Sequence, residues 1–257
     1  MEQIVIPLVA FAASLLTFFS GFGLGTLLMP VFAIFFPVDL AVGMTAVVHF
    51  LNGLFKVGLV GRHAVKRVVV RFGAPAVLGA VIGAWFLTQI SDADPILTYR
   101  LGEREFRVFP VKFVVAALIV VFTLFELLPK LRNMEISSRY LSLGGILSGF
   151  FGGLSGHQGA LRSAFLARAG LSKEQFVATG AMIATFIDVA RIGVYSTHFA
   201  ADGFSANSRL LILTTAAAFA GAFAGNRVLQ KVTMRGIQVF VSFSLLVLSM
   251  ALGAGLI

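Results

Sequence analysis

Four charged side chains lie inside long apolar stretches of this 257-residue sequence: Lys56, Arg162, Arg191 and Asp188. A charge at the centre of a bilayer costs about 2.5–3.5 kcal/mol even on insertion scales, so charges in such stretches are candidates for function. Three cations against a single acid leave an excess of positive charge. Such a field favours an anionic ligand over a cation or a sugar.

A glycine-rich break in an apolar stretch occurs twice, once in each half of the chain. The first runs from Gly21 to Pro30 as GFGLGTLLMP, and the second runs from Gly149 to Arg162 as GFFGGLSGHQGALR. A helix is expected to start just after each glycine cluster, near Thr26 and near Gln158. Helix N-termini carry about half a positive charge and unpaired N–H groups, so they bind carboxylate, phosphate or sulfonate. Two such helix starts that meet near the midplane would form a small cradle for an oxyanion.

We therefore predict two groups of site residues. The predicted substrate-binding group is Gly21, Gly23, Gly25, Thr26, Gly156, His157, Gln158, Gly159 and Arg162. The predicted path or gate is His49, Asn52, Lys56, Asp188 and Arg191. We expect no catalytic residue, no metal site and no cofactor.

Several of these candidates also have an ordinary structural explanation. Arg162 and Lys56 are near enough to helix ends to extend toward the membrane surface. Asp188 and Arg191 are three residues apart on one helix face, where they would neutralise each other as a gate or a structural pair. His157 could serve packing alone. Asp188 and the histidines are the only candidate proton carriers within the membrane, so proton coupling stays an open hypothesis.

Composition places the chain in a membrane. The hydrophobic fraction is 58% and the mean hydropathy is +0.97, whereas a soluble domain is roughly 45–50% apolar. The net charge of +9 would suit a nucleic-acid binder, but the basic residues occupy short loops between apolar runs, as membrane topology requires. We expect no nucleic-acid partner. The absence of cysteine excludes disulfides and thiolate chemistry. Because the start of the chain lacks a basic region, the first apolar segment is expected to remain in the mature protein.

The apolar segments follow the same order in both halves, which predicts an all-α membrane protein built from an internal repeat. A shift of 135 residues aligns Gly21 with Gly156 and Lys56 with Arg191. The N-terminal repeat, residues 1–130, is expected to contain a broken hairpin and three helices, at 4–36, 40–60, 72–90 and 111–128. The C-terminal repeat, residues 131–257, is expected to contain the same elements at 141–169, 175–197, 210–224 and 237–257.

The distribution of Lys and Arg predicts the topology. If both broken segments crossed the membrane, the two sides would carry eight and nine cations, which is no bias. If each is a re-entrant hairpin, the split is twelve against five, as the positive-inside rule requires. We therefore expect six spans and two hairpins, with both termini on the outer face. The halves are then related by an inverted two-fold axis, as in alternating-access transporters. Gly79-xxx-Gly83 and Gly221-xxx-Gly225 are predicted helix-packing seams.

Three segments of the chain resemble the sulfite exporter TauE/SafE family of bacterial membrane proteins. They are the pattern GxGxGxxxxP at 21–30, the small residues AVGMTA at 41–46, and GGLSGHQGALRSAFL at 152–166. In the last of these, Ala160 and Phe165 replace the family's usual Gly and Pro, and His157, Gln158 and Arg162 add polarity. The resemblance covers essentially the whole chain. It implies transport of sulfite, organosulfonates or related organic acids, and the departures fall where specificity should lie.

The main hypothesis is a secondary transporter that moves a small anion across the bacterial inner membrane by alternating access. An anion channel of the same architecture is an alternative. A third hypothesis is an intramembrane serine protease, because GLSG at 153–156 matches the rhomboid signature and would make Ser155 the nucleophile. A nucleophilic serine needs a base within hydrogen-bond reach, and beyond the adjacent His157 only His198 follows the motif, so we expect no enzyme. A purely structural membrane subunit is disfavoured by the buried charges. The expected partners are a small anion, the lipid bilayer, a proton as candidate coupling ion and a second copy of the chain as candidate homodimer.

Overall fold

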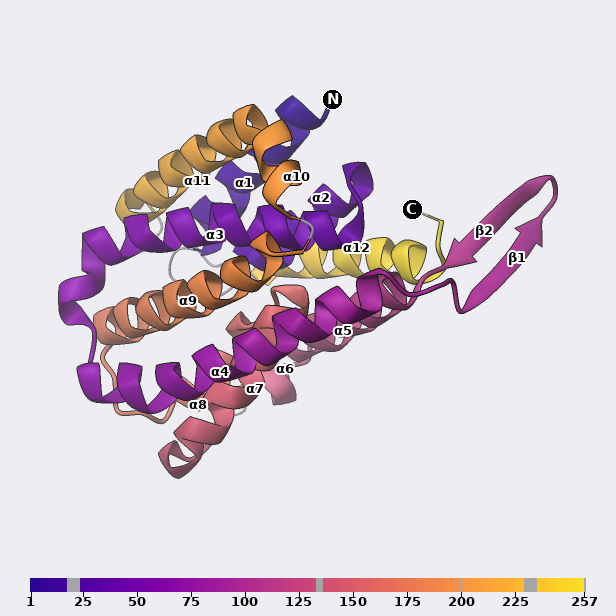
Figure 1. Ribbon diagram of the computed structural model, residues 1–257. Coiled ribbons are helices and arrows are strands. Elements are labelled where there is room, and N and C mark those ends of the chain that lie inside the picture. Colours follow the sequence, from indigo (N-terminus) through magenta and orange to yellow (C-terminus); the bar gives the residue numbers. More distant parts are fainter. Residues whose placement is uncertain (18–23, 133–135, 199, 229–234, 257) are drawn as a thin grey trace.

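A computed structural model describes residues 1–17, 24–132, 136–198, 200–228 and 235–256, which form a helical bundle with one projecting β-hairpin (Figure 1). The elements of the first half are α1 (Glu2–Thr17), α2 (Leu24–Phe35), α3 (Val38–Val60), η1 (Gly61–His63), α4 (Lys66–Ser91), β1 (Leu97–Leu101), β2 (Arg104–Val108), α5 (Pro110–Leu127) and α6 (Pro129–Arg132). Those of the second half are η2 (Ser138–Tyr140), α7 (Leu141–Ser155), α8 (Gly159–Leu166), α9 (Lys173–Ser196), α10 (Ala200–Ala206), α11 (Ser208–Val228) and α12 (Arg235–Gly253).

Four of these helices are long and apolar enough to cross a membrane. Among the described residues they are Val38–His63, Lys66–Ser91, Lys173–Ser196 and Ser208–Gly225. Shorter apolar helices are Glu2–Leu16, Leu24–Phe35, Pro110–Phe125 and Ser242–Gly253. Large apolar side chains such as Leu78, Ile212 and Phe243 are exposed on the outer surfaces, where lipid would cover them. The chain is therefore a predominantly α-helical membrane protein.

The β-hairpin is an element that the sequence analysis did not predict. β1 and β2 pair antiparallel, with Leu97 opposite Val108 and Tyr99 opposite Phe106. The Tyr99 and Phe106 rings stack with centroids 5.5 Å apart, and Gly102 has φ +64° in the turn. Apolar residues at every second position of a short segment form one face of a strand. These alternating residues lie between the predicted helices at 72–90 and 111–128, where the sequence analysis predicts no regular element.

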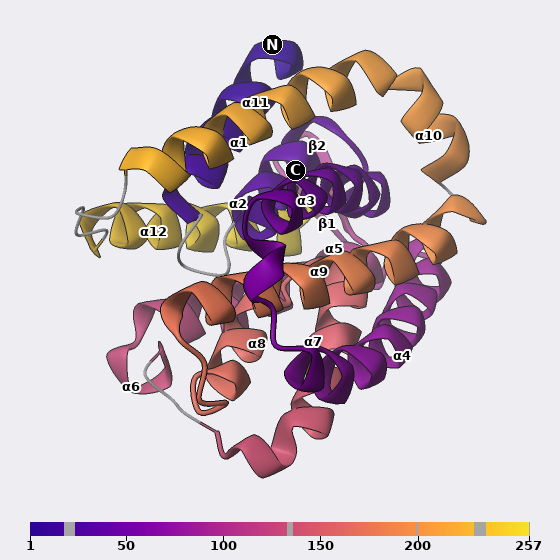
Figure 2. The same ribbon diagram turned by 90° about the vertical axis from the view of Figure 1, so that its left-hand side faces the viewer.

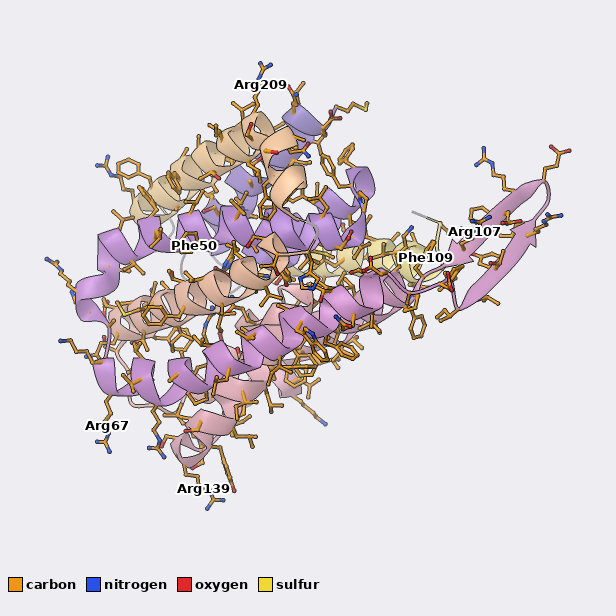
Figure 3. The ribbon with its side chains drawn as sticks, in the orientation of Figure 1. Phe50, Arg67, Arg107, Phe109, Arg139 and Arg209 are labelled. Carbon is orange, nitrogen blue, oxygen red and sulfur yellow. The ribbon has the colours of Figure 1, made fainter. Side chains whose placement is uncertain are left out.

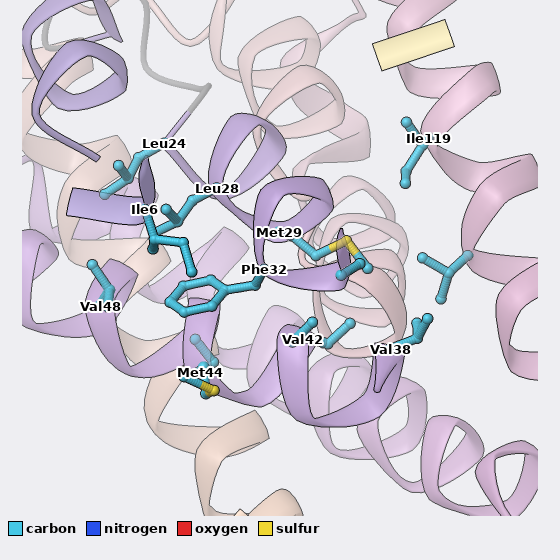
Figure 4. Packing of buried hydrophobic residues seen from close by; sticks show 14 of the residues in the cluster. Ile6, Leu24, Leu28, Met29, Phe32, Val38, Val42, Met44, Val48 and Ile119 are labelled. Atoms are coloured by element: carbon cyan, nitrogen blue, oxygen red, sulfur yellow. The ribbon is translucent and has the colours of Figure 1, made fainter. Parts of the chain in front are cut away.

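Each broken segment folds into an antiparallel helix pair. In the first, Ile6 near the start of α1 packs beside Leu28 and Phe32 of α2, all fully buried (Figure 4). In the second, the N–H of Ile136, before α7, donates to the carbonyl of Ala164 in α8 at 3.1 Å. The end of α8 thus lies beside the segment that leads into α7, so the second pair returns toward its own starting point.

The two halves pack in a crossed pattern, in which α4 lies against α7 and α11 lies against α1 (Figure 2). A Cβ atom at Gly79 or Gly83 would collide with the backbone carbonyls of Ile146 and Phe150 in α7. A Cβ at Gly221 would collide with the carbonyl of Phe11 in α1. Small residues let helix backbones approach closely in membranes. The predicted seams are confirmed at these three glycines.

Candidate functional site

The two glycine breaks meet in the folded protein at Gly25 and Gly156. A Cβ placed on Gly25 would lie 3.4 Å from the Gly156 carbonyl oxygen, 3.6 Å from Cδ2 of His49 and 3.9 Å from Cγ2 of Thr45. Gly25 is the second residue of α2, and Thr26, the third, is buried. Gly21 and Gly23 lie outside the described residues. The start of α2 therefore contacts the turn of the second helix pair.

That turn between α7 and α8 is short and tightly held. Gly156 ends α7 with φ +81°, in the left-handed region that favours glycine, and its N–H donates to the Gly152 carbonyl at 3.0 Å. Gln158 is the N-cap of α8, and Gly159 is its first residue. The helix starts where the sequence predicted it. His157 and Gln158 in the turn are each only 2% exposed.

The centre of the site is the carboxylate of Asp188 in α9, which has no exposed surface. Its Oδ2 lies 2.6 Å from Nδ1 of His49 in α3. Its Oδ1 accepts from Arg191 Nε at 2.9 Å and forms an ion pair with Arg191 Nη2 at 2.7 Å. Hydrogen bonds between ionised partners are roughly twice as strong as neutral ones. The carboxylate thus joins one helix from each half of the chain.

Gln158 extends this network toward Arg162. Its Nε2 donates to Oδ1 of Asp188 at 3.4 Å, and its Oε1 accepts from Nη1 of Arg162 at 3.0 Å. Ser148 of α7 supports the turn by donating its hydroxyl to the Gln158 carbonyl at 2.9 Å. Arg162 is 4% exposed and lies against Gly180 of α9. Its guanidinium therefore points inward, and the alternative in which it extends to the membrane surface is wrong.

Arg191 and Tyr195 fasten α9 to the end of α7. Arg191 Nη1 donates to the Gly152 carbonyl at 3.2 Å, and the Tyr195 hydroxyl donates to the carbonyl of Gly153. Both side chains are fully buried. Sequence reasoning missed Tyr195, although its spacing from Asp188 and Arg191 on one helix face could have revealed it.

The two ring nitrogens of His157 differ in their hydrogen bonding. Nδ1 lies 2.9 Å from the Ser155 carbonyl, to which it must donate, and the ring stacks on Phe122 with centroids 6.0 Å apart. Nε2 is buried and has no hydrogen-bond partner among the described residues. In the neutral ring Nε2 is an acceptor. Nε2 of His157 can therefore hydrogen-bond to an anion only when the ring is protonated, or when the anion itself carries a hydrogen that it can donate.

The proton on Nδ1 also decides whether His157 could activate Ser155 as a nucleophile. The Ser155 hydroxyl is fully buried and donates to the carbonyl of Phe151 at 3.1 Å. His157 Nδ1 lies 3.3 Å from this hydroxyl, but it already carries a proton for the Ser155 carbonyl. That nitrogen cannot act as the general base that a nucleophilic serine requires.

The remaining candidates of α3 lie on one face of that helix. Asn52 is buried and accepts at Oδ1 from the Ser14 hydroxyl of α1 at 3.3 Å, so it points toward α1 rather than into the network. Lys56 is partly buried, close enough to Arg162 for their charges to repel. Thr45, which sequence reasoning did not select, is buried one turn before His49, and its hydroxyl has no partner among the described residues.

These side chains form a closed, donor-rich cluster with more positive than negative charge. The guanidinium of Arg191, the imidazole of His49 and the amide of Gln158 contact the carboxylate, and the guanidinium of Arg162 is connected to it through Gln158. Guanidinium groups match the geometry of carboxylates and other oxyanions. Within the described parts of the chain, no group of three or more His, Cys, Asp or Glu residues could hold a metal. The donors of this cluster bind one oxyanion of the protein itself, the carboxylate of Asp188.

The chain was compared with protein-family models, with curated proteins and with solved structures. The family model described as Sulfite exporter TauE/SafE matches residues 6–252, nearly the whole chain. No curated protein and no solved structure matches the chain significantly.

Proposed function

The chain belongs to the sulfite exporter TauE/SafE family, and from this membership we propose that it carries a small oxyanion across the bacterial inner membrane. The proposed substrate is sulfite, an organosulfonate or a related organic acid. The proposed site is the donor cluster where the two helix breaks meet, between α2, α3, α9 and the turn before α8.

One observation supports this site above all others: the cluster already holds an oxyanion. The Asp188 carboxylate receives donors from Arg191, His49 and Gln158. A sulfite or sulfonate group offers the same kind of acceptor, with oxygens around one central atom. The starts of α2 and α8 add N–H groups that have no partner within their own helices.

The crossed packing supports alternating access. α4 belongs to the first half and packs on α7, the first helix of the second pair. α11 belongs to the second half and packs on α1, the first helix of the first pair. An inverted repeat produces this exchange, because each pair is then covered by a helix of the other half. The proposed topology places each helix pair as a re-entrant hairpin and both termini on the outer face. In Figure 3, Arg67 and Arg139 point outward at one end, whereas Arg107 lies at the other end on the β-hairpin.

The closed site favours a carrier over a channel. Asp188 and Arg191 have no exposed surface, so the described arrangement encloses the site instead of opening it to both sides. A carrier passes through such a closed state in each cycle, whereas a conducting channel needs a continuous aqueous path.

Flux measurements on purified protein in proteoliposomes test the proposal. We expect saturable uptake of sulfite and methanesulfonate, faster than that of sucrose, together with exchange against substrate preloaded inside the vesicles. Exchange that exceeds net flux identifies a carrier. Absence of flux for every oxyanion in the panel, relative to empty liposomes, would refute the proposed function, and unsaturable flux without exchange would indicate a channel.

A further inference from the structure

The carboxylate of Asp188 occupies the same donors that an oxyanion substrate would need. Both of its oxygens are engaged, one by His49 at 2.6 Å and the other by Arg191 at 2.7 and 2.9 Å. Gln158 approaches the second oxygen at 3.4 Å and connects it to Arg162. A carboxylate of the protein itself therefore occupies the donors of the cluster.

A second negative charge cannot enter this cluster easily while Asp188 is ionised. Two like charges that share one site oppose each other, and the conflict is relieved when one of them takes up a proton. If Asp188 became neutral, Arg191 would be left with its positive charge uncompensated in a buried place. An incoming oxyanion would restore that compensation.

His49 provides a route for the proton. Its side chain is 18% exposed, whereas that of Asp188 is fully buried. Its Cδ2, which is bonded to Nε2, faces Gly25 at the first helix break. A proton from water can bond to Nε2, while the Nδ1–H bond breaks and an O–H bond forms on Oδ2 of Asp188. The ring ends neutral with its proton on Nε2, the carboxylate ends as a neutral acid, and the net uptake is one proton.

The other ionisable groups that interact with Asp188 or with its neighbours Arg162 and Arg191 come from α3, from the turn with α8, and from α9. α3 contributes Lys56 in addition to His49, the turn and α8 contribute His157 and Arg162, and α9 contributes Arg191 and Tyr195. α4 has no Asp, Glu, Lys, Arg or His from Phe72 to Ser91. Asp188 is the only acid in this group. The arginines stay charged at every physiological pH.

We infer that the protein takes up one proton on Asp188, through His49, each time it binds its oxyanion. This inference rests on the proposed function, because it concerns the same site. A purely structural Arg191–Asp188 pair would have no need of a partly exposed histidine from α3 on the second carboxylate oxygen. The binding of one singly charged anion together with one proton leaves the net charge of the site unchanged.

Methanesulfonate is a suitable probe, because a sulfonate stays ionised throughout the working range and any pH effect then belongs to the protein. Calorimetry in buffers of different ionisation enthalpy counts the protons taken up per bound anion. For the wild type we expect about one proton at alkaline pH, with a Kd that rises about tenfold per pH unit there. This measurement needs no variant.

Asp188→Asn tests the residue itself. Asparagine keeps the shape of the side chain, can still accept from Arg191 and can donate to Nδ1 of His49. We expect the variant to bind methanesulfonate more tightly than the wild type at alkaline pH, without proton uptake and with little dependence on pH. Asp94→Asn, at an exposed position outside the cluster, is the matched control and should behave as the wild type. His49→Gln should retain the proton uptake at equilibrium and slow the transport driven by a pH gradient.

The results separate this inference from the proposed function. Wild-type protein that binds methanesulfonate without proton uptake overturns the inference and leaves oxyanion transport standing. A folded Asp188→Asn variant that binds methanesulfonate more weakly than the wild type at alkaline pH also overturns the inference and leaves oxyanion transport standing. Proton uptake that persists in Asp188→Asn and disappears in His157→Gln would assign the proton to His157 and also overturn it. Equal transport rates in His49→Gln and wild type would overturn the route through His49. Protein that neither binds nor transports any oxyanion refutes the proposed function itself.

Discussion

His49 and Asp188 are separated by 139 positions in the sequence, yet Nδ1 of the imidazole lies 2.6 Å from Oδ2 of the carboxylate. One residue belongs to α3 and the other to α9, which lie side by side in the bundle. Each helix follows the broken segment of its own half. This contact therefore connects the two halves at the place where both breaks converge.

Removing Arg191 should strongly destabilise the protein. Arg191→Ala leaves a fully buried carboxylate without its ion-pair partner, which typically costs about 3–5 kcal/mol. Thermal unfolding in detergent should show a clear loss relative to Arg67→Ala, where the arginine is exposed. The double variant Arg191→Leu/Asp188→Leu should recover part of the loss. Unchanged stability in Arg191→Ala would contradict the central role of this pair in the fold.

Arg162→Ala should weaken oxyanion binding without changing the response to neutral solutes. A hydrogen bond to a charged group contributes about 1.5–3 kcal/mol, which corresponds to a roughly tenfold to hundredfold rise in Kd. Binding of methanesulfonate to purified protein measures this directly, with Arg67→Ala as the control of equal charge change. A Kd within about twofold of the wild type would place the binding site elsewhere.

Enlarging Gly25 should block the site in a graded manner. Alanine at this position would make ordinary contacts, with its Cβ 3.4 Å from the Gly156 oxygen and 3.6 Å from the His49 ring. The two additional methyl groups of valine would enter the space between the helix breaks. We expect Gly25→Ala to retain most of the sulfite flux and Gly25→Val to lose it. Gly193→Val controls for the helix propensity of valine, since a Cβ at Gly193 meets nothing within 4 Å.

The α4–α7 seam should not tolerate side chains. In Gly149→Ala the new Cβ would collide with the backbone of Ala76, and overpacking of this kind typically costs about 1–3 kcal/mol. The melting temperature of the purified variant should fall, while Gly58→Ala, where the added Cβ has open space, should match the wild type. Equal melting temperatures for both variants would show that the two helices can separate without cost.

The proposed topology can be tested by thiol labelling, because the natural chain contains no cysteine. Thr98→Cys on β1 and Arg62→Cys after α3 are both exposed positions. A membrane-impermeant maleimide added to intact cells, with the outer membrane permeabilised, should label position 98 and leave position 62 unlabelled until the inner membrane is opened. The reverse pattern would invert the orientation, and labelling of both positions would contradict a membrane between them.

The sequence by itself determined the class of the protein and the positions of its main helices. Hydropathy depends only on neighbouring residues, so the apolar runs around α3, α4, α9 and α11 could be found without a structure. The spacing of Gly79 and Gly83 predicted a helix contact, because two glycines four residues apart lie on one face of a helix and let another helix approach closely. The start of α8 beside Gln158 followed from the glycine break before it.

The tertiary structure alone decided which of the candidates lie together. Asn52 and His49 share a face of α3, yet the first bonds to Ser14 of α1 and the second to Asp188 of α9, because α3 lies between those two helices. Periodicity states which residues share a face and not which helix that face will meet. The contact of Gly25 with Gly156 depends on how segments more than one hundred residues apart pack against each other. The inward orientation of Arg162 depends on how α8 packs against α9. Packing is a property of the whole bundle, and no local pattern encodes it.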